Sequence, residues 1–261
     1  MGTETELKIL VIGDVIGKPG REAVKKILPH LRDEYGITLA IANGENAAGG
    51  IGLTPGTAED LFDSGVDVIT SGNHIWAHPE IVPYLNGDAA VIRPLNYPPM
   101  TPGRGYWVKD NIMVVNLVGR TFVGDFDCPF RAMDKLLDEL DRKPAVIIVD
   151  FHAEATSEKV AMGRYLDGRV SAVLGTHTHI GTIDACILPK GTAYVTEIGM
   201  VGPIDSVIGV EVSNAIDRFL TQMPKRFSVA KGQVSFDAIV VEASEDSGKA
   251  IDIKRVREMA D

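Results

Sequence analysis

The chain is organised around six short apolar runs between residues 7 and 179. Most of them hold aliphatic and β-branched residues without alternation, which is typical of strands buried on both faces of a sheet. The runs are LKILVIGD (7–14), ITLAIANGEN (37–46), VDVITSGNH (66–74), NIMVVNLVG (111–119), AVIIVDFHAE (145–154) and SAVLGTHTH (171–179). Helix-like segments lie between several of these runs, at 19–36, 54–65, 130–143 and 155–168. Because a β–helix–β order joins parallel strands by crossovers, the sequence predicts an α/β fold.

The last third of the sequence has a different order of elements. We expect strands at 192–200, within 226–244 and at 249–258, and a helix at 210–224. A Lys231-Gly232 turn is expected to join two strands within the second of these segments. Strands joined by tight turns pair antiparallel, so the second half predicts a mixed sheet or a second sheet. Since no linker rich in proline or serine interrupts the chain, we expect a single domain over residues 1–261.

The charge of the chain restricts its partners. Its 36 acidic residues outnumber its 26 basic residues, which gives a formal net charge of −10. Binding to a long polyanion requires clustered lysine and arginine, so no long nucleic acid is expected as a partner. A small anionic substrate is compatible with this charge if a bound cation reverses the local field.

Cysteine content and the N-terminal sequence favour a cytoplasmic protein. Cys128 and Cys186 are the two cysteines and form no CxxC pair, which argues against a disulfide framework or a cysteine metal site. The N-terminal MGTETELKILVIGD has neither a basic segment nor a long apolar one, so a signal peptide is not expected. No window approaches 18 uninterrupted apolar residues, so no membrane span is expected either.

Five of the apolar runs end in side chains that bind metals, mostly beside a glycine. In chain order they are Gly13-Asp14, Gly44-Glu45-Asn46, Gly72-Asn73-His74, His152, and Gly175 followed by His177 and His179. Each has an ordinary alternative, as a helix cap, a turn, a structural histidine or a solvated loop. In an extended chain, residues i and i+2 point the same way roughly 7 Å apart, so His177 and His179 are expected to face one site. That site would lie beyond the carboxyl ends of the strands.

If the strands align, two carboxylates, two asparagine amides and four imidazoles converge on one edge. Two carboxylates about 4 Å apart repel by roughly 4 kcal/mol at an effective dielectric constant of 20. A buried polar group without a partner costs about 1–3 kcal/mol more. Bound cations would offset both the repulsion between the carboxylates and the cost of the unpaired polar groups. Oxygen and nitrogen ligands favour a first-row transition metal, with iron or manganese first and zinc as the alternative. Because so many ligands exceed the need of one ion, we expect two ions that share a bridging carboxylate.

The motif series resembles that of the calcineurin-type metallophosphoesterase superfamily, which runs GD, GD or GE, GNH, a lone His and GH-x-H. The chain is most similar to the bacterial YmdB-like branch, through IGDVIGKPGR, NGENAAGG, GNHIW, DFHAEATSEK, GTHTHI and LPKGTAYVTEIGM. The resemblance implies a four-layer α/β/β/α sandwich of two mixed sheets flanked by helices. It also implies a phosphodiesterase that hydrolyses small phosphodiesters, notably 2′,3′-cyclic nucleotides. Two departures from the wider superfamily are shared with this branch: Val15 and Ile16 replace the usual D-x-H histidine, and Glu45 replaces aspartate.

The resemblance further implies a role for each residue of the series. One ion would be bound by Asp14, Asn46 and His179, and the other by Asn73, His152 and His177. Glu45 would bridge them, with Asn46 in the place of the missing histidine. His74 would be the general acid that protonates the leaving oxygen after a metal-bridging hydroxide attacks phosphorus. The alternative for His74 is a packing role beneath Trp76.

Two other functions stay open at this stage. A non-catalytic metalloprotein that binds a phosphorylated ligand or a protein partner would need the metal ligands but no general acid. A phosphatase for monoesters or phosphoproteins would use the same metals. Arg120 is compatible with a phosphate clamp and equally with a surface salt bridge, and homo-oligomerisation is left open.

Overall fold

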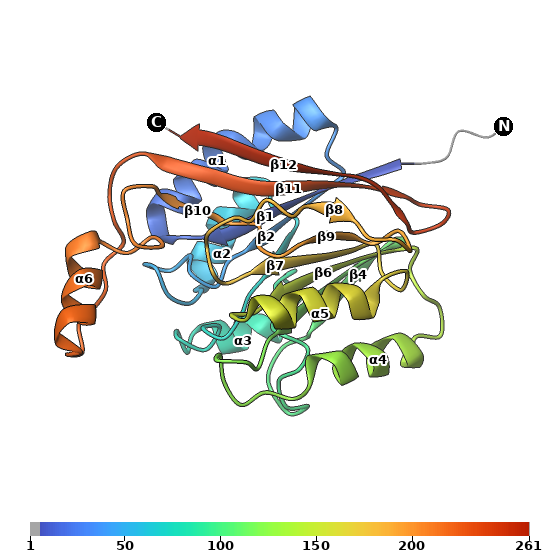
Figure 1. Ribbon diagram of the computed structural model, residues 1–261, viewed down its shortest axis with the longest axis horizontal. Helices are drawn as coiled ribbons and strands as arrows, with labels where there is room; N and C mark the ends of the chain where they lie inside the picture. The colour runs from blue at the N-terminus through green and yellow to red at the C-terminus, as the bar shows by residue number, and fades with distance from the viewer. Residues whose placement is uncertain (1–5, 261) are drawn as a thin grey trace.

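The computed structural model describes residues 6–260 and contains two six-stranded mixed sheets (Figure 1). The first has the order β12-β11-β10-β1-β2-β3, with β1 Glu6–Val15, β2 Leu39–Asn43, β3 Val68–Thr70, β10 Met200–Pro203, β11 Val234–Ser244 and β12 Ala250–Ala260. The second has the order β4-β5-β6-β7-β9-β8, with β4 Tyr106–Lys109, β5 Ile112–Val118, β6 Val146–His152, β7 Ala172–Thr176, β8 Cys186–Ile187 and β9 Ala193–Val195. Each sheet has parallel strands at its centre and antiparallel strands at an edge.

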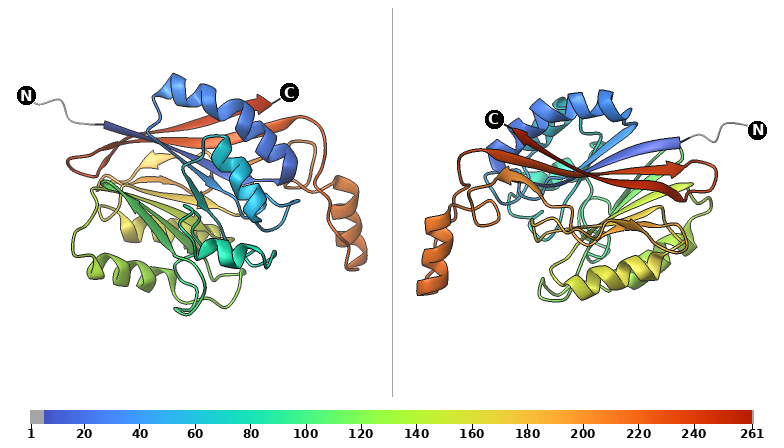
Figure 2. Two further views of the ribbon diagram at one scale, coloured as in Figure 1. Left: turned by 180° about the vertical axis from the view of Figure 1, so that it is seen from behind. Right: turned by 45° about the horizontal axis from the view of Figure 1, so that its top comes forward.

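Helices cover the outer face of each sheet, so the molecule has four layers (Figure 2). The helices are α1 Gly17–Tyr35, α2 Pro55–Asp63, α3 Ile81–Leu85, α4 Pro129–Glu139, α5 Thr156–Leu166 and α6 Val212–Thr221. Helices α1 and α2 lie on the first sheet and α4 and α5 on the second, whereas α6 projects away from the body. The predicted α/β/β/α sandwich is therefore confirmed.

Three apolar clusters hold the four layers together. Alternate residues of β1 point to opposite faces, so Leu10 and Ile12 belong to the cluster beneath α1, whereas Ile9 and Val11 lie between the two sheets. A third cluster fills the space between the second sheet and helices α4 and α5. Burial of each such side chain contributes about 1.5–3 kcal/mol. The cluster shared by both sheets is consistent with a single domain, which stays a prediction.

The expected strands at the centre of both sheets are confirmed, but two segments of the last third differ from the prediction. Residues 192–200 divide into β9 in the second sheet and the start of β10 in the first, because the chain crosses between the sheets there. The hairpin expected at Lys231-Gly232 is wrong. Residues 226–233 contain no strand and form an isolated bridge, Val210–Val229, with the residues that precede α6. The short elements α3, β4 and β8 were not predicted.

No helix among residues 6–260 is long and apolar enough to cross a bilayer. The expectation about a signal peptide rests partly on residues 1–5, which lie outside the described range.

Candidate metal centre

The metal-binding residues predicted from the sequence lie at the carboxyl ends of the parallel strands, and these ends of the two sheets lie close together. Asp14 is near the end of β1, and His152 is the last residue of β6. Glu45, Asn73 and His177 follow β2, β3 and β7. This arrangement brings side chains that are far apart in the sequence to one edge, as expected for an α/β fold.

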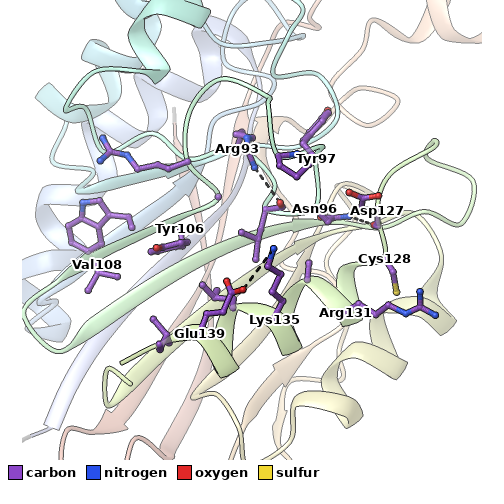
Figure 3. Close-up of a pocket in the computed structure, with 18 residues that line it drawn as sticks. Arg93, Asn96, Tyr97, Tyr106, Val108, Asp127, Cys128, Arg131, Lys135 and Glu139 are labelled. Carbon is purple, nitrogen blue, oxygen red and sulfur yellow. Dashed lines mark hydrogen bonds and ion pairs between the residues drawn. The ribbon is translucent and has the colours of Figure 1, made fainter. Parts of the chain in front are cut away.

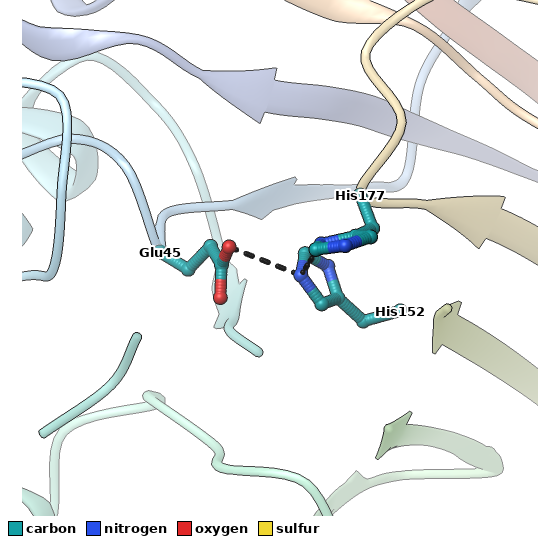
Figure 4. Close-up of side chains that lie close together, drawn as sticks. All are labelled: Glu45, His152 and His177. Carbon is teal, nitrogen blue, oxygen red and sulfur yellow. Dashed lines mark hydrogen bonds and ion pairs between the residues drawn. The ribbon is translucent and has the colours of Figure 1, made fainter. Parts of the chain in front are cut away.

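Glu45, His152 and His177 form the tightest group and point toward one another (Figure 4). His152 Nε2 lies 3.0 Å from Glu45 Oε1 and 2.9 Å from His177 Nδ1. A single imidazole proton serves only one of these neighbours, whereas a cation binds all three donors at once. The donor atoms lie within 4.8 Å of one another, which suits metal–ligand distances of about 2.0–2.2 Å.

Asp14, Asn46 and His179 form a neighbouring group. His179 Nε2 lies 3.2 Å from Asn46 Nδ2 and 3.5 Å from Asp14 Oδ1. Asp14 Oδ1 is also 3.9 Å from His152 Nδ1, and Asp14 Oδ2 accepts a hydrogen bond from the His177 backbone N–H (3.1 Å). The two groups are therefore adjacent.

Two buried oxygen atoms at the site, Asp14 Oδ1 and Asn73 Oδ1, lack a hydrogen-bond partner within residues 6–260. Such atoms cost about 1–3 kcal/mol each unless a ligand binds them. Asn73 follows Gly72, where a Cβ atom would lie 2.3 Å from both Glu45 Oε2 and His152 Cδ2, so glycine is required for this close approach. Free carboxylate and amide oxygens beside imidazoles fit divalent transition metals.

The charges of the cluster shift its pKa values in opposite directions. Burial raises the pKa of Asp14 and of Glu45, but the neighbouring histidines outweigh burial and hold both pKa values below their ordinary range. Burial lowers the pKa of His152 and of His179, yet Glu45 and Asp14 raise that of His152, and Asp14 raises that of His179, each to about 9. Burial and the charge of His152 together lower the pKa of His177 to about 3. A cation that binds here has to displace the protons that pair with the carboxylates.

A buried polar floor fixes the orientation of His152. The floor consists of Asn43, Thr70, Asp150 and Thr176. Thr176 Oγ1 donates to Asp150 Oδ1 (2.6 Å) and lies 3.0 Å from His152 Nδ1. Since the one hydroxyl proton goes to Asp150, His152 Nδ1 is the donor to Thr176, which leaves Nε2 free to bind a metal. Burial raises the pKa of Asp150 to about 6.

Sequence reasoning missed this floor. Asn43 and Thr70 also donate hydrogen bonds to Asp150. The available signal was Asp150 itself, which is a charged residue inside the apolar run of β6.

A buried ion pair holds the turn that carries His177 and His179. Lys159 Nζ lies 2.6 Å from Glu197 Oε2, which also accepts hydrogen bonds from the Thr178 backbone N–H (3.1 Å) and hydroxyl (2.7 Å). Strand β7 ends at residue 176, and the two histidines have φ values of 98° and 65°. Their expected extended geometry is therefore wrong, although both face the site. Such backbone costs about 1–3 kcal/mol per residue, which these hydrogen bonds offset.

The cluster opens into a cavity of about 760 Å³ that His74 lines. The His74 side chain is 38% exposed, and its Nδ1 lies 3.2 Å from Glu45 Oε1. Its backbone N–H donates to Glu45 Oε2 (3.1 Å). The ring contact of Trp76 is with Tyr97, so the alternative packing role of His74 gains no support from it.

Arg120 lies outside this cavity. It lines a separate cavity of about 510 Å³, and its backbone N–H donates to Glu158 Oε1 (3.1 Å).

A larger cavity of about 980 Å³ lies between β4, the segment that precedes it and helix α4 (Figure 3). Two of its cations are engaged within the protein: Arg93 donates to backbone carbonyls, including that of Pro94 (2.8 Å), and Lys135 lies 3.9 Å from Glu139. The groups of metal-binding side chains within the described residues lie elsewhere. The buried group of Glu45, His152 and His177 adjoins the 760 Å³ cavity instead.

Known proteins resemble the chain over nearly its whole length. A family model described as YmdB-like protein matches residues 10–256. A protein of Bacillus subtilis (strain 168) named 2′,3′-cyclic-nucleotide 2′-phosphodiesterase is 47% identical over 254 residues, which cover 96% of each chain.

Two solved structures share the fold. A hypothetical protein of Thermus thermophilus has 46% identity and a TM-score of 0.91, over 98% of this chain and 100% of that one. A structure described as a novel phosphatase, from Mycoplasma pneumoniae, has 33% identity and a TM-score of 0.93, over 99% of this chain and 95% of that one.

Proposed function

The chain belongs to the YmdB-like protein family, and on that premise we propose that it is a metal-dependent phosphodiesterase that hydrolyses small phosphodiesters. The proposed substrates are 2′,3′-cyclic nucleotides, which the name of the Bacillus subtilis relative specifies. The observation that carries the proposal is the convergence of Glu45, His152 and His177 at 2.9–3.0 Å beside two buried oxygens without a hydrogen-bond partner among the described residues.

We assign the ligands in two sets. Asp14, Asn46 and His179 would hold one ion, Asn73, His152 and His177 would hold the other, and Glu45 would be shared by both. The oxygen and nitrogen donors support iron or manganese, with zinc as the alternative. When bound, two such ions supply Lewis acidity and a water that ionises near neutral pH. The chain contributes the fixed spacing of the two sets and the orientation of His152 by its floor.

His74 is the proposed proton donor to the leaving oxygen. Its imidazole is half-exposed in the cavity, and Glu45 holds both its backbone N–H and its Nδ1, so the ring has a fixed position at the mouth of the site. Proton transfer by a positioned histidine contributes about 10²–10⁴-fold to such reactions.

The test is hydrolysis of adenosine 2′,3′-cyclic phosphate and of bis-p-nitrophenyl phosphate with Mn²⁺ or Fe²⁺, before and after a chelator. We expect turnover that the chelator abolishes. A faster rate on the matching monoesters would favour a phosphatase. Absence of turnover on both ester classes would favour a non-catalytic metal-dependent regulator.

We also propose a cytoplasmic location, which the unpaired thiols of Cys128 and Cys186 support. Homo-oligomerisation stays a prediction, and light scattering of the purified chain measures it.

A further inference from the structure

The segment from residue 204 to residue 233, here termed the arm, joins β10 to β11 and carries α6 (Figures 1 and 2). It lines the 760 Å³ cavity together with His74, His177 and His179. A cavity of this size accommodates a whole small ligand, so it exceeds what a single phosphodiester group requires.

The arm is fixed relative to the metal centre. His179 Nδ1 lies 2.9 Å from the carbonyl oxygen of Ile208, at the base of the arm. The two legs of the arm are hydrogen-bonded to each other: the Glu211 backbone N–H donates to Ser228 O (3.0 Å), and Asn214 Nδ2 donates to Ser228 Oγ (2.8 Å). Side chains on the arm are therefore presented to the cavity in a defined position.

Three cations of the arm, Arg218, Lys225 and Arg226, line this cavity in a protein of net charge −10. Lys225 is engaged with Asp217. The Arg218 guanidinium lies over the Phe227 ring, 5.0 Å from its centroid. Within residues 6–260, neither Arg218 nor Arg226 has a side-chain hydrogen bond or an ion pair.

A guanidinium stacked on an aromatic ring keeps its N–H donors at the edge of its plane. The cation–π contact with Phe227 leaves the Arg218 donors, which can bind phosphate in bidentate fashion, without a hydrogen bond among the described residues. Two unengaged arginines line the same cavity as the proposed phosphodiester site, which is the arrangement that a second anionic group of a substrate would fill.

We propose that Arg218 and Arg226 form an anion subsite for a phosphate other than the one that is hydrolysed. The preferred substrate is then a cyclic phosphodiester nucleotide that carries a further phosphate, for example at its 5′ position. The acidic surface argues against a long strand, so the subsite serves one or a few phosphates. This inference rests on the proposed function for its substrate, although the subsite itself can be tested by binding alone.

The kinetic test compares adenosine 2′,3′-cyclic phosphate with the same compound bearing a 5′-phosphate. We expect the 5′-phosphate to lower KM by about tenfold, since charge-assisted hydrogen bonds to phosphate contribute on this scale. In the double variant Arg218→Ala, Arg226→Ala, the ratio of the two KM values should fall to about one. Arg142→Ala removes an exposed arginine far along the chain from the arm and is the matched control, with the parental ratio expected.

The binding test uses adenosine 3′,5′-bisphosphate and adenosine 3′-monophosphate in calorimetry with the metal-loaded protein. Tighter binding of the bisphosphate that is lost in the double variant and kept in Arg142→Ala would support the subsite. This holds even if neither cyclic compound is hydrolysed. Absence of hydrolysis would refute the proposed function and not the subsite. Equal affinity of the two ligands, or a preference that survives in the double variant, would overturn the subsite.

Discussion

The floor of the site and the arm above it differ in how their polar groups are used. At the floor, Asp150 accepts hydrogen bonds from three neighbours and lies fully inside the protein. On the arm, Arg218 and Arg226 face the cavity without an ion pair among the described residues. A side chain whose hydrogen-bond partners all belong to the protein can orient its neighbours. A side chain whose N–H donors have no partner in the protein can also bind a ligand. This difference is consistent with the proposed chemistry at the strand ends and with the proposed role of the arm in substrate choice.

The largest effect is expected at the ligands above the floor. Glu45→Gln removes the charge that lies between the two ligand sets, and stabilisation of the transition state by metals is worth several kcal/mol, so we expect turnover to fall by about 10⁴-fold. Metal content, measured by mass spectrometry of the purified protein, should fall with it. Glu139→Gln on α4 is the control, and a Glu45→Gln protein with full turnover would show that the strand ends do not carry the chemistry.

His74→Ala separates catalysis from metal binding. His74 touches Glu45 but is not one of the proposed ligands, so turnover should fall by about 10²–10³-fold while the metal content stays at the parental value. Parallel assays of turnover and metal content measure this. Full turnover in the variant would show that His74 is not the general acid. Loss of the bound metals would show that His74 supports the structure of the metal centre.

Asp150→Asn tests whether the floor acts through His152. The neutral amide weakens the hydrogen bonds that fix Thr176 and, through it, the imidazole, so we expect metal affinity to fall by about 10–100-fold. Competition with a chromophoric chelator measures this affinity. Asp138→Asn, on the exposed side of α4, is the matched control. Unchanged affinity would mean that the floor supports folding alone.

Protonation of the proposed histidine ligands should make metal affinity depend on pH, with a smaller and more gradual effect than that of the substitutions above. The pKa of His152 and of His179 is raised to about 9 in the metal-free fold, from an ordinary value of 6.5. The raised values stabilise the metal-free fold below pH 6.5, and this contribution is lost as pH rises through about 9. Because metals bind the neutral rings, metal affinity should rise about tenfold or more per pH unit over this window. Calorimetry in buffers of different ionisation enthalpy should detect proton release, and its absence near pH 7.5 would contradict the raised values.

The sequence was sufficient for the parts of the molecule that local pattern determines. Apolar runs without alternation identify the central strands, and residues that follow such strands must lie at one edge, so the positions of Asp14, Glu45 and His152 could be anticipated. The floor could not, because Asn43 and Asp150 lie within strands of different sheets, so their contact depends on how the two sheets pack against each other. The geometry of His177 and His179 likewise depends on Glu197 and Lys159. The segment after α6 was misjudged because its β-branched and aromatic residues pair with residues 209–211, which precede α6, instead of with a sheet.

The central claim is that side chains from Asp14 to His179 surround two cations. Anomalous diffraction from crystals grown with Mn²⁺ tests it directly. The account predicts two peaks that share Glu45, one beside Asp14 and His179 and the other beside His152 and His177. A single peak, or manganese bound away from these side chains, would contradict it.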